Sequence, residues 1–144
     1  MMFLPDTNVW IRFLNPGENQ VKDRFLSADP STIWLCSVVK AELFFGAMKS
    51  TRIPKNLVLL DELFVDFESL SFEDDAARKY GDIRSDLARK GTPIGPNDLM
   101  IAAIASVHEA VLVTHSASGG LFVIEIQVPE SLLQQQQENQ PCNQ

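Results

Sequence analysis

Short apolar runs alternate with helical segments along most of this chain, and this alternation limits the possible folds more than any other feature of the sequence. The expected strands are a run ending near Asp6, 32–37, 67–72, 110–115 and 121–128, and the expected helices are 8–15, 19–28, 38–49, 55–66, 74–90 and 97–110. The strands have the composition of strands that are covered on both faces. The pattern predicts an α/β fold with a parallel β-sheet sandwiched between helices.

Length and composition fit one globular domain. The chain has 144 residues, of which 45% are hydrophobic and 22% charged, enough apolar material for a single core. We expect one domain over residues 1–130. The remaining segment, 131–144, reads SLLQQQQENQPCNQ, and its Gln-rich composition predicts disorder.

The charge balance limits the kinds of partner. The net charge of −7 argues against nucleic-acid binding through a broad basic surface, but it leaves room for an enzyme that faces phosphate through bound cations. No apolar run reaches the roughly 18–20 residues of a membrane span, and the start MMFLPDTN lacks the basic region of a signal peptide. The two cysteines have no metal-site spacing. We expect a cytoplasmic protein without a membrane segment.

Two carboxylates stand at places where an α/β sheet binds ligands, the carboxyl ends of its strands. Asp6 directly follows the first expected strand, and the alternative is that it caps the helix that begins near Asn8. Asn97 and Asp98 open the almost wholly apolar helix 97–110. The alternative for this pair is helix capping, because Asn and Asp accept orphan N–H groups at helix starts.

A third carboxylate, Glu42, falls on the expected helix 38–49, which is apolar nearly all round. It projects onto the stripe formed by Val38, Ala41, Phe45 and Met48. An ionised carboxylate there is costly unless it is paired or coordinated. A salt bridge to a distant Arg is the alternative to a site role.

The predicted layout brings the three carboxylates to one rim of the sheet. Like charges in one site raise one another's pKa, and a hard divalent cation such as Mg²⁺ or Mn²⁺ removes that penalty. A metal held by carboxylates is suited to the hydrolysis of phosphodiesters. The sequence contains no Walker loop, GxGxxG motif or Ser-His-Asp pattern that points to a competing chemistry.

Four stretches of the chain resemble one known family, the PIN-domain ribonucleases, and specifically the VapC toxins of type II toxin–antitoxin systems. They are PDTNVWIRFL (5–14), SVVKAELFFGAMKS (37–50), YGDIRSDLARKG (80–91) and PIGPNDLMIAAIA (93–105). The resemblance covers about residues 2–115. It implies a PIN-like parallel sheet flanked by helices and Mg²⁺- or Mn²⁺-dependent endonucleolytic cleavage of RNA, often tRNA or rRNA. It also implies a cognate antitoxin protein and a homodimer.

The resemblance assigns the catalytic and metal-binding acids to Asp6, Glu42 and Asp98. Thr7 and Asn8 lie in the first motif and Asn97 precedes the third acid, so all three are expected to steady the site. Ser37 is either the cap of the helix 38–49 or a site hydroxyl, and the cap is favoured.

The chain departs from the family after LVTH. The family commonly continues with Asn or Asp and then a Glu-Phe-x-Arg stretch, whereas this chain has Ser116 and then ASGGLFVIE. Ser116 remains a candidate for contacting a metal through water. The departure motivates a second hypothesis, a degenerate PIN domain that binds antitoxin or RNA without cutting. A third, an aspartyl phosphatase with Asp6 as nucleophile, expects an Asp where this chain has Asn8.

An aromatic-rich set of side chains lies on two expected helices beside the first two acids. Most of its members are expected in the core, and a subset is expected to line a groove for an antitoxin helix. The set comprises Trp10, Phe13, Phe44, Phe45 and Met48.

Overall fold

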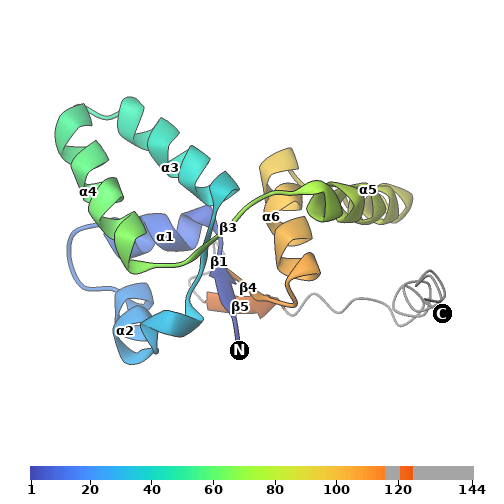
Figure 1. Ribbon diagram of the computed structural model, residues 1–144, viewed down its shortest axis with the longest axis horizontal. Coiled ribbons are helices and arrows are strands. Elements are labelled where there is room, and N and C mark those ends of the chain that lie inside the picture. Colours follow the sequence, from blue (N-terminus) through green and yellow to red (C-terminus); the bar gives the residue numbers. More distant parts are fainter. Residues whose placement is uncertain (116–120, 125–144) are drawn as a thin grey trace, which may run out of the picture.

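The computed structural model describes residues 1–115 and 121–124. Figure 1 shows short strands enclosed by helices. In chain order the elements are β1 (Phe3–Pro5), α1 (Thr7–Leu14), α2 (Gln20–Ser27), the 3₁₀ turn η1 (Pro30–Thr32), β2 (Leu35–Cys36), α3 (Ser37–Met48), α4 (Ile53–Asp66), β3 (Ser69–Leu70), α5 (Asp74–Arg89), α6 (Pro96–Val107), β4 (Val111–His115) and β5 (Leu121–Ile124).

The sheet is parallel except at one edge. β1 pairs in parallel with β4, with Phe3 opposite Val111, and β2 pairs in parallel with β3. A parallel bridge between Phe3 and Ile33 connects these two pairs. β5 runs antiparallel to β4. The predicted α/β class is confirmed, and an antiparallel edge strand on a parallel sheet is common in such folds.

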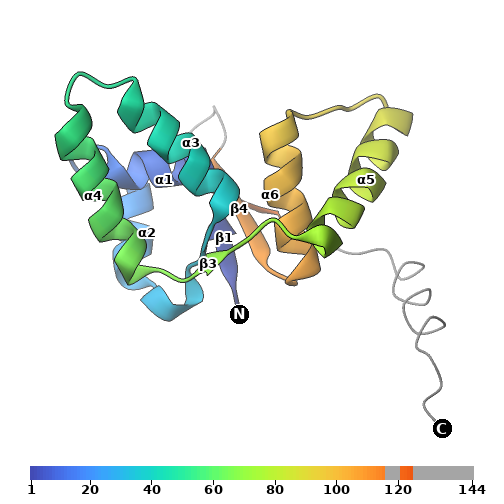
Figure 2. The ribbon, with the colours of Figure 1, turned by 45° about the horizontal axis from the view of Figure 1, so that its top comes forward.

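The helices form two groups around the strands. Figure 2 shows α1, α2, α3 and α4 on one side of β1 and β4, with α5 and α6 side by side on the other. α6 is the most buried helix: Leu99 and every residue from 101 to 106 are buried. Such a helix is apolar all round because it is covered all round, as the sequence predicted for this segment.

Two predicted strands are much shorter than expected. The run 32–37 forms a strand only at Leu35–Cys36, because Asp29 and Pro30 first set a 3₁₀ turn in which the Asp29 side chain accepts from the Ser31 N–H. The run 67–72 pairs only at Ser69–Leu70. β2 ends where α3 begins, and β3 ends a few residues before α5.

The predicted stripe on α3 is partly wrong. The buried residues of this helix are Val38, Val39, Leu43 and Ala47. Phe45 and Met48 are instead exposed, as is Ala41. Because α3 is apolar on every side, periodicity alone did not identify which face packs against the rest of the protein.

Several expectations fall outside the described residues. They are the role of Ser116, the residues 125–128 of the last expected strand, and the disorder of 131–144. Among the residues that the structure describes, no helix is both long enough and apolar enough to cross a bilayer.

Candidate active site

Asp6 is fixed at the carboxyl end of β1. Its N–H donates to the Val113 carbonyl at 2.9 Å, which extends the pairing of β1 with β4 by one residue. Its carboxylate Oδ1 accepts from the Val9 N–H at 3.0 Å, so Asp6 is the N-cap of α1. The capping alternative is therefore confirmed, and it is compatible with a site role because the second carboxylate oxygen takes no part in the cap.

Thr7 connects α1 to the acid on α3. Its hydroxyl donates to Glu42 Oε1 at 2.8 Å, and its side chain is only 9% exposed. Glu42 is half-buried. A charge-assisted hydrogen bond of this kind holds a carboxylate in a defined orientation. Sequence reasoning placed Thr7 near the site but did not identify its partner, which is 35 residues away.

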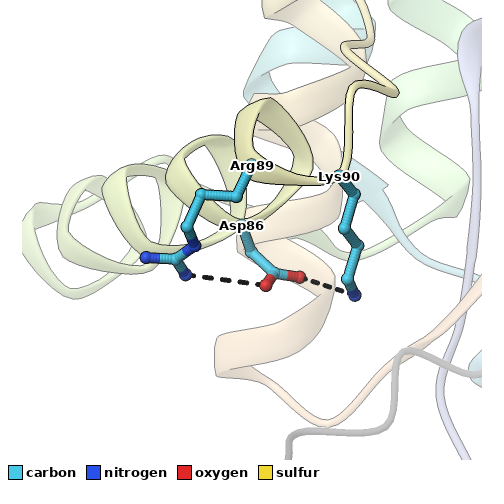
Figure 3. Close-up of polar contacts among 3 residues, drawn as sticks. All are labelled: Asp86, Arg89 and Lys90. Atoms are coloured by element: carbon cyan, nitrogen blue, oxygen red, sulfur yellow. Dashed lines mark ion pairs between the residues drawn. The ribbon is translucent and has the colours of Figure 1, made fainter.

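The salt-bridge alternative for Glu42 is wrong within the part of the chain that the structure describes. The ion pairs there join Asp86 of α5 to Arg89 at 3.6 Å and to Lys90 at 3.0 Å. Figure 3 shows Asp86 between these two cations, at the exposed end of the helix. Glu42 thus has no cationic partner among the described residues.

Asp98 occupies the first turn of α6, and the capping alternative for it is wrong. The N-cap is Gly95, followed by Pro96 as the first helical residue, and no side chain bonds the cap. Pro suits this position because its missing N–H would be unpaired there in any case. The Asp98 carboxylate lies within van der Waals reach of a Cβ placed on Gly95, at 3.8 Å from Oδ2, and makes no hydrogen bond within the described residues.

The pKa shifts indicate that the three acids are electrostatic neighbours. Burial raises the pKa of Asp6, and the carboxylates of Asp98 and Glu42 raise it further, against the lowering effect of the Val9 N–H. Partial burial, followed by the Glu42 carboxylate, raises the pKa of Asp98. The carboxyl end of β1, the middle of α3 and the start of α6 therefore contribute to one acidic region, in which these carboxylates repel one another.

The three carboxylates interact but do not yet converge. Within residues 1–115 and 121–124, no three His, Cys, Asp or Glu side chains are close enough to surround a metal ion. Three neighbouring anions repel one another, which disfavours close approach of the carboxylates when no cation lies between them.

The predicted supporting residues differ in their surroundings. Asn8 and Asn97 are exposed on the first turns of α1 and α6. Ser37 is the first residue of α3 and not its cap, which is Cys36. The favoured prediction for Ser37 is therefore wrong: its Oγ accepts from the Phe72 N–H at 3.2 Å and joins α3 to the segment before α5.

An open cavity of about 610 Å³ lies away from the acids. It is formed between η1 and the end of α4, and its lining includes Pro30, Phe64 and Glu68. These residues precede β2 and β3, so the cavity is at the amino ends of the strands, opposite the acidic region. It contains none of the predicted site residues.

Comparison with known proteins assigns the chain to a family. The family model for the PIN domain matches residues 3–116, and the chain belongs to the PIN-domain family. Its relatives within that family are VapC-type ribonucleases. The tRNA(fMet)-specific endonuclease VapC of Salmonella typhimurium is 35% identical over 116 residues, which are 81% of this chain and 87% of the relative. Ribonuclease VapC2 of Rickettsia felis is 34% identical over 117 residues, with the same two shares.

Solved structures give the same assignment. A chain of the DNA-bound VapBC structure from Salmonella typhimurium matches with a TM-score of 0.73 and 36% identity, covering 79% of this chain and 86% of that one. VapBC2 from Rickettsia felis, bound to a DNA fragment from its promoter, matches with a TM-score of 0.73 and 33% identity, covering 81% and 88%. The predicted resemblance and fold are thus confirmed.

Proposed function

We propose that this chain is the toxin of a type II toxin–antitoxin system and cleaves RNA phosphodiesters with the help of Mg²⁺ or Mn²⁺. The observation that carries the proposal is the acidic region of Asp6, Glu42 and Asp98, in which burial and mutual repulsion raise the pKa of Asp6 and Asp98. The ribonuclease activity named for the VapC relatives supports a role of this region in RNA cleavage.

The donor set fits a hard divalent cation. Carboxylate oxygens are the ligands that Mg²⁺ and Mn²⁺ prefer, and a cation between three repelling carboxylates relieves their repulsion. When bound, the ion would supply hydroxide near neutral pH and stabilise negative charge on the phosphate. Asp6, Glu42 and Asp98 would hold it.

The protein's own contribution is to fix these acids. The Val9 N–H and the pairing with Val113 hold Asp6 in place, and the Thr7 hydroxyl orients Glu42. Such preorganisation lowers the cost of arranging the ligands during the reaction. Asn8, Asn97, Ser37 and Ser116 are proposed to support the site from its edge.

The partners follow from the same relatives. VapBC structures contain toxin and antitoxin together, and we assign this chain a cognate antitoxin that blocks the acidic region, a homodimeric form and a cytoplasmic location. The RNA substrate is proposed to be a tRNA or rRNA, since one relative is named for tRNA(fMet).

One experiment tests the cleavage. The purified chain, freed of antitoxin, is incubated with total tRNA and Mn²⁺ or Mg²⁺, beside Asp98→Asn and a sample with EDTA. Discrete fragments with the wild type alone, lost in EDTA, are expected. Intact RNA in every lane, from a folded protein that still binds a divalent ion, would contradict cleavage and favour the non-cleaving PIN domain that the Ser116 segment motivates.

A further inference from the structure

An exposed aromatic ring and a cation occupy the same face of α3 as Glu42. Phe45 is 63% exposed, and Lys49 Nζ lies 4.5 Å from the centroid of its ring. Phe45 follows Glu42 by three residues and Lys49 follows Phe45 by four, the spacings at which helical side chains are neighbours. Glu42, Phe45 and Lys49 therefore form one row, which we call the α3 row.

The dimensions of the α3 row suit a linear polymer that is bound at the acids and extends along α3. With a rise of about 1.5 Å per residue, Phe45 stands about 4.5 Å and Lys49 about 10.5 Å beyond Glu42 along the helix axis. Both views of the ribbon place the start of α3 beside α6, whose first turn carries Asp98. A ligand held at the acids thus has the α3 row directly next to it.

The chemistry of the α3 row is that of a nucleotide contact. An exposed aromatic ring stacks on any unpaired base, and a neighbouring ammonium binds the adjoining phosphate. Lys49 forms no ion pair within the described residues, so its charge is available to an anion. Exposed cation–π pairs are weak, so the Lys49 ammonium can leave the face of the Phe45 ring for a phosphate.

We propose that Phe45 and Lys49 bind the RNA beside the scissile phosphate, with Phe45 stacked on an unpaired base and Lys49 against a neighbouring phosphate. This inference deepens the proposed function and rests on it. It defines the substrate class more closely: the nucleotide next to the cleaved bond is unstacked, as in a loop or single strand, because a base inside a duplex has no free face for the ring.

Charge favours RNA over an apolar protein helix as the occupant of the α3 row. A helix packed on Phe45 would bury the Lys49 ammonium, which is costly without a partner anion. A nucleotide offers a base to the ring and a phosphate to the ammonium. Since the whole chain carries a charge of −7, an isolated cation next to the acids has a large effect on where an anionic chain can approach.

The test measures RNA binding by the full chain, freed of antitoxin and carrying Asp98→Asn so that the RNA stays intact. The probe is a labelled, unstructured oligoribonucleotide, compared with a duplex of the same sequence. Phe45→Ala should weaken single-strand binding roughly 5- to 150-fold, the loss of one stacked base, with little change for the duplex. Lys49→Gln should reduce the slope of log affinity against log salt by about 0.7, one phosphate contact.

Matched controls come from the same molecule. Leu26→Ala removes another exposed apolar side chain, on α2. Lys40→Gln removes a cation from α3 itself, one that lies 5.0 Å from the Phe64 ring and faces α4. Both should bind RNA like the parent chain. Phe45→Trp should keep the affinity, and RNA should quench its added fluorescence beyond any change in the parent, which contains Trp10 and Trp34.

The outcomes separate this inference from the proposed function. Binding by Phe45→Ala equal to that of Leu26→Ala, with any loss confined to antitoxin binding, would overturn the inference. Specific loss of RNA binding would support it even if the wild-type chain cleaved no RNA, in which case only the proposed cleavage fails. Thermal melting of each variant checks that the exposed substitutions leave the fold intact.

Discussion

Thr7 shows how a single hydroxyl group can organise the candidate site. It directly follows Asp6, which ends the pairing of β1 with β4, and donates to Glu42 on α3. Two neighbouring positions therefore fix two acids from different parts of the chain.

We expect Thr7→Val to reduce RNA cleavage about 10-fold or more, in line with hydrogen bonds to charged groups worth roughly 1.5–3 kcal/mol. Val keeps the branched shape and the packing but cannot donate to Glu42 Oε1. Thr7→Ser keeps the hydroxyl and should retain most of the activity. Initial cleavage rates on tRNA, with melting temperatures alongside, measure the effect, and equal rates for Thr7→Val and wild type would show that the hydroxyl does not position Glu42.

Asp98→Asn should abolish cleavage while making the metal-free protein more stable. The reason is that partial burial, followed by repulsion from the Glu42 carboxylate, raises the pKa of Asp98, so a neutral amide removes an unfavourable charge. Melting temperatures in EDTA should rise by a few degrees, and the stabilisation that Mn²⁺ gives the wild type should shrink. A lower melting temperature for the variant in EDTA would contradict repulsion at this position.

For individual residues, the sequence was more informative about the candidate acids than about the residues around them. Asp6, Glu42 and Asp98 could be selected as candidates because each is a carboxylate next to a strand end or on an apolar helix. The cap assigned to Ser37 was wrong because β2 continues directly into α3, with Cys36 still extended at φ −139° and ψ 161°. The composition of the sequence does not show whether a helix begins at one residue or at the next.

α5 and the loop that follows it contain two glycines in different backbone conformations. Gly81 lies inside α5, where an added Cβ would meet nothing within 4 Å. Gly91 follows the helix with a φ of +69°, a conformation that suits glycine because it has no Cβ.

Substituting alanine at these two glycines should therefore change stability in opposite directions. Gly81→Ala should raise the free energy of unfolding by about 0.5–1 kcal/mol, the helix penalty of glycine. Gly91→Ala should lower it by about 1 kcal/mol or more, the cost of a left-handed backbone for an L side chain. Denaturant titration of both variants measures the shifts; the same sign for both would be inconsistent with the backbone of this turn.

Elements with a clear pattern were predictable, and elements set by their neighbours were not. α6 was expected as a buried helix from seven consecutive apolar residues, 99–105, and is one. α3 is equally apolar, but its exposed face became visible only once α4 and the strands were placed. The two-residue lengths of β2 and β3 depend on their pairing with each other, which no local pattern specifies.

The acidic region makes the stability of the whole molecule depend on pH. Asp6 and Asp98 have raised pKa values in the folded state, so between the ordinary carboxyl pKa and these raised values the folded chain binds more protons than the unfolded chain. Stability of the metal-free protein should therefore fall as pH rises through this window.

Asp86 gives stability the opposite dependence on pH. Asp86, whose pKa is lowered by its bond to Lys90, stabilises above the ordinary carboxyl pKa and loses that contribution as pH falls. The variant with Asp6→Asn and Asp98→Asn keeps Asp86, and Asn still offers an oxygen to the Val9 N–H. The difference in melting temperature between wild type and this variant, measured in EDTA, should widen in favour of the variant as pH rises from the acid range to neutrality. A constant difference would refute the assignment.

The pairing of β1 with β4 also determines when the enzyme first exists during protein synthesis. Asp6 takes its position from a bond to Val113, so the first motif to leave the ribosome waits for a strand near the other end of the chain. Contacts so distant in sequence close late. A growing chain therefore has no complete acidic region until the strand that carries Val113 has been synthesised and has paired with β1.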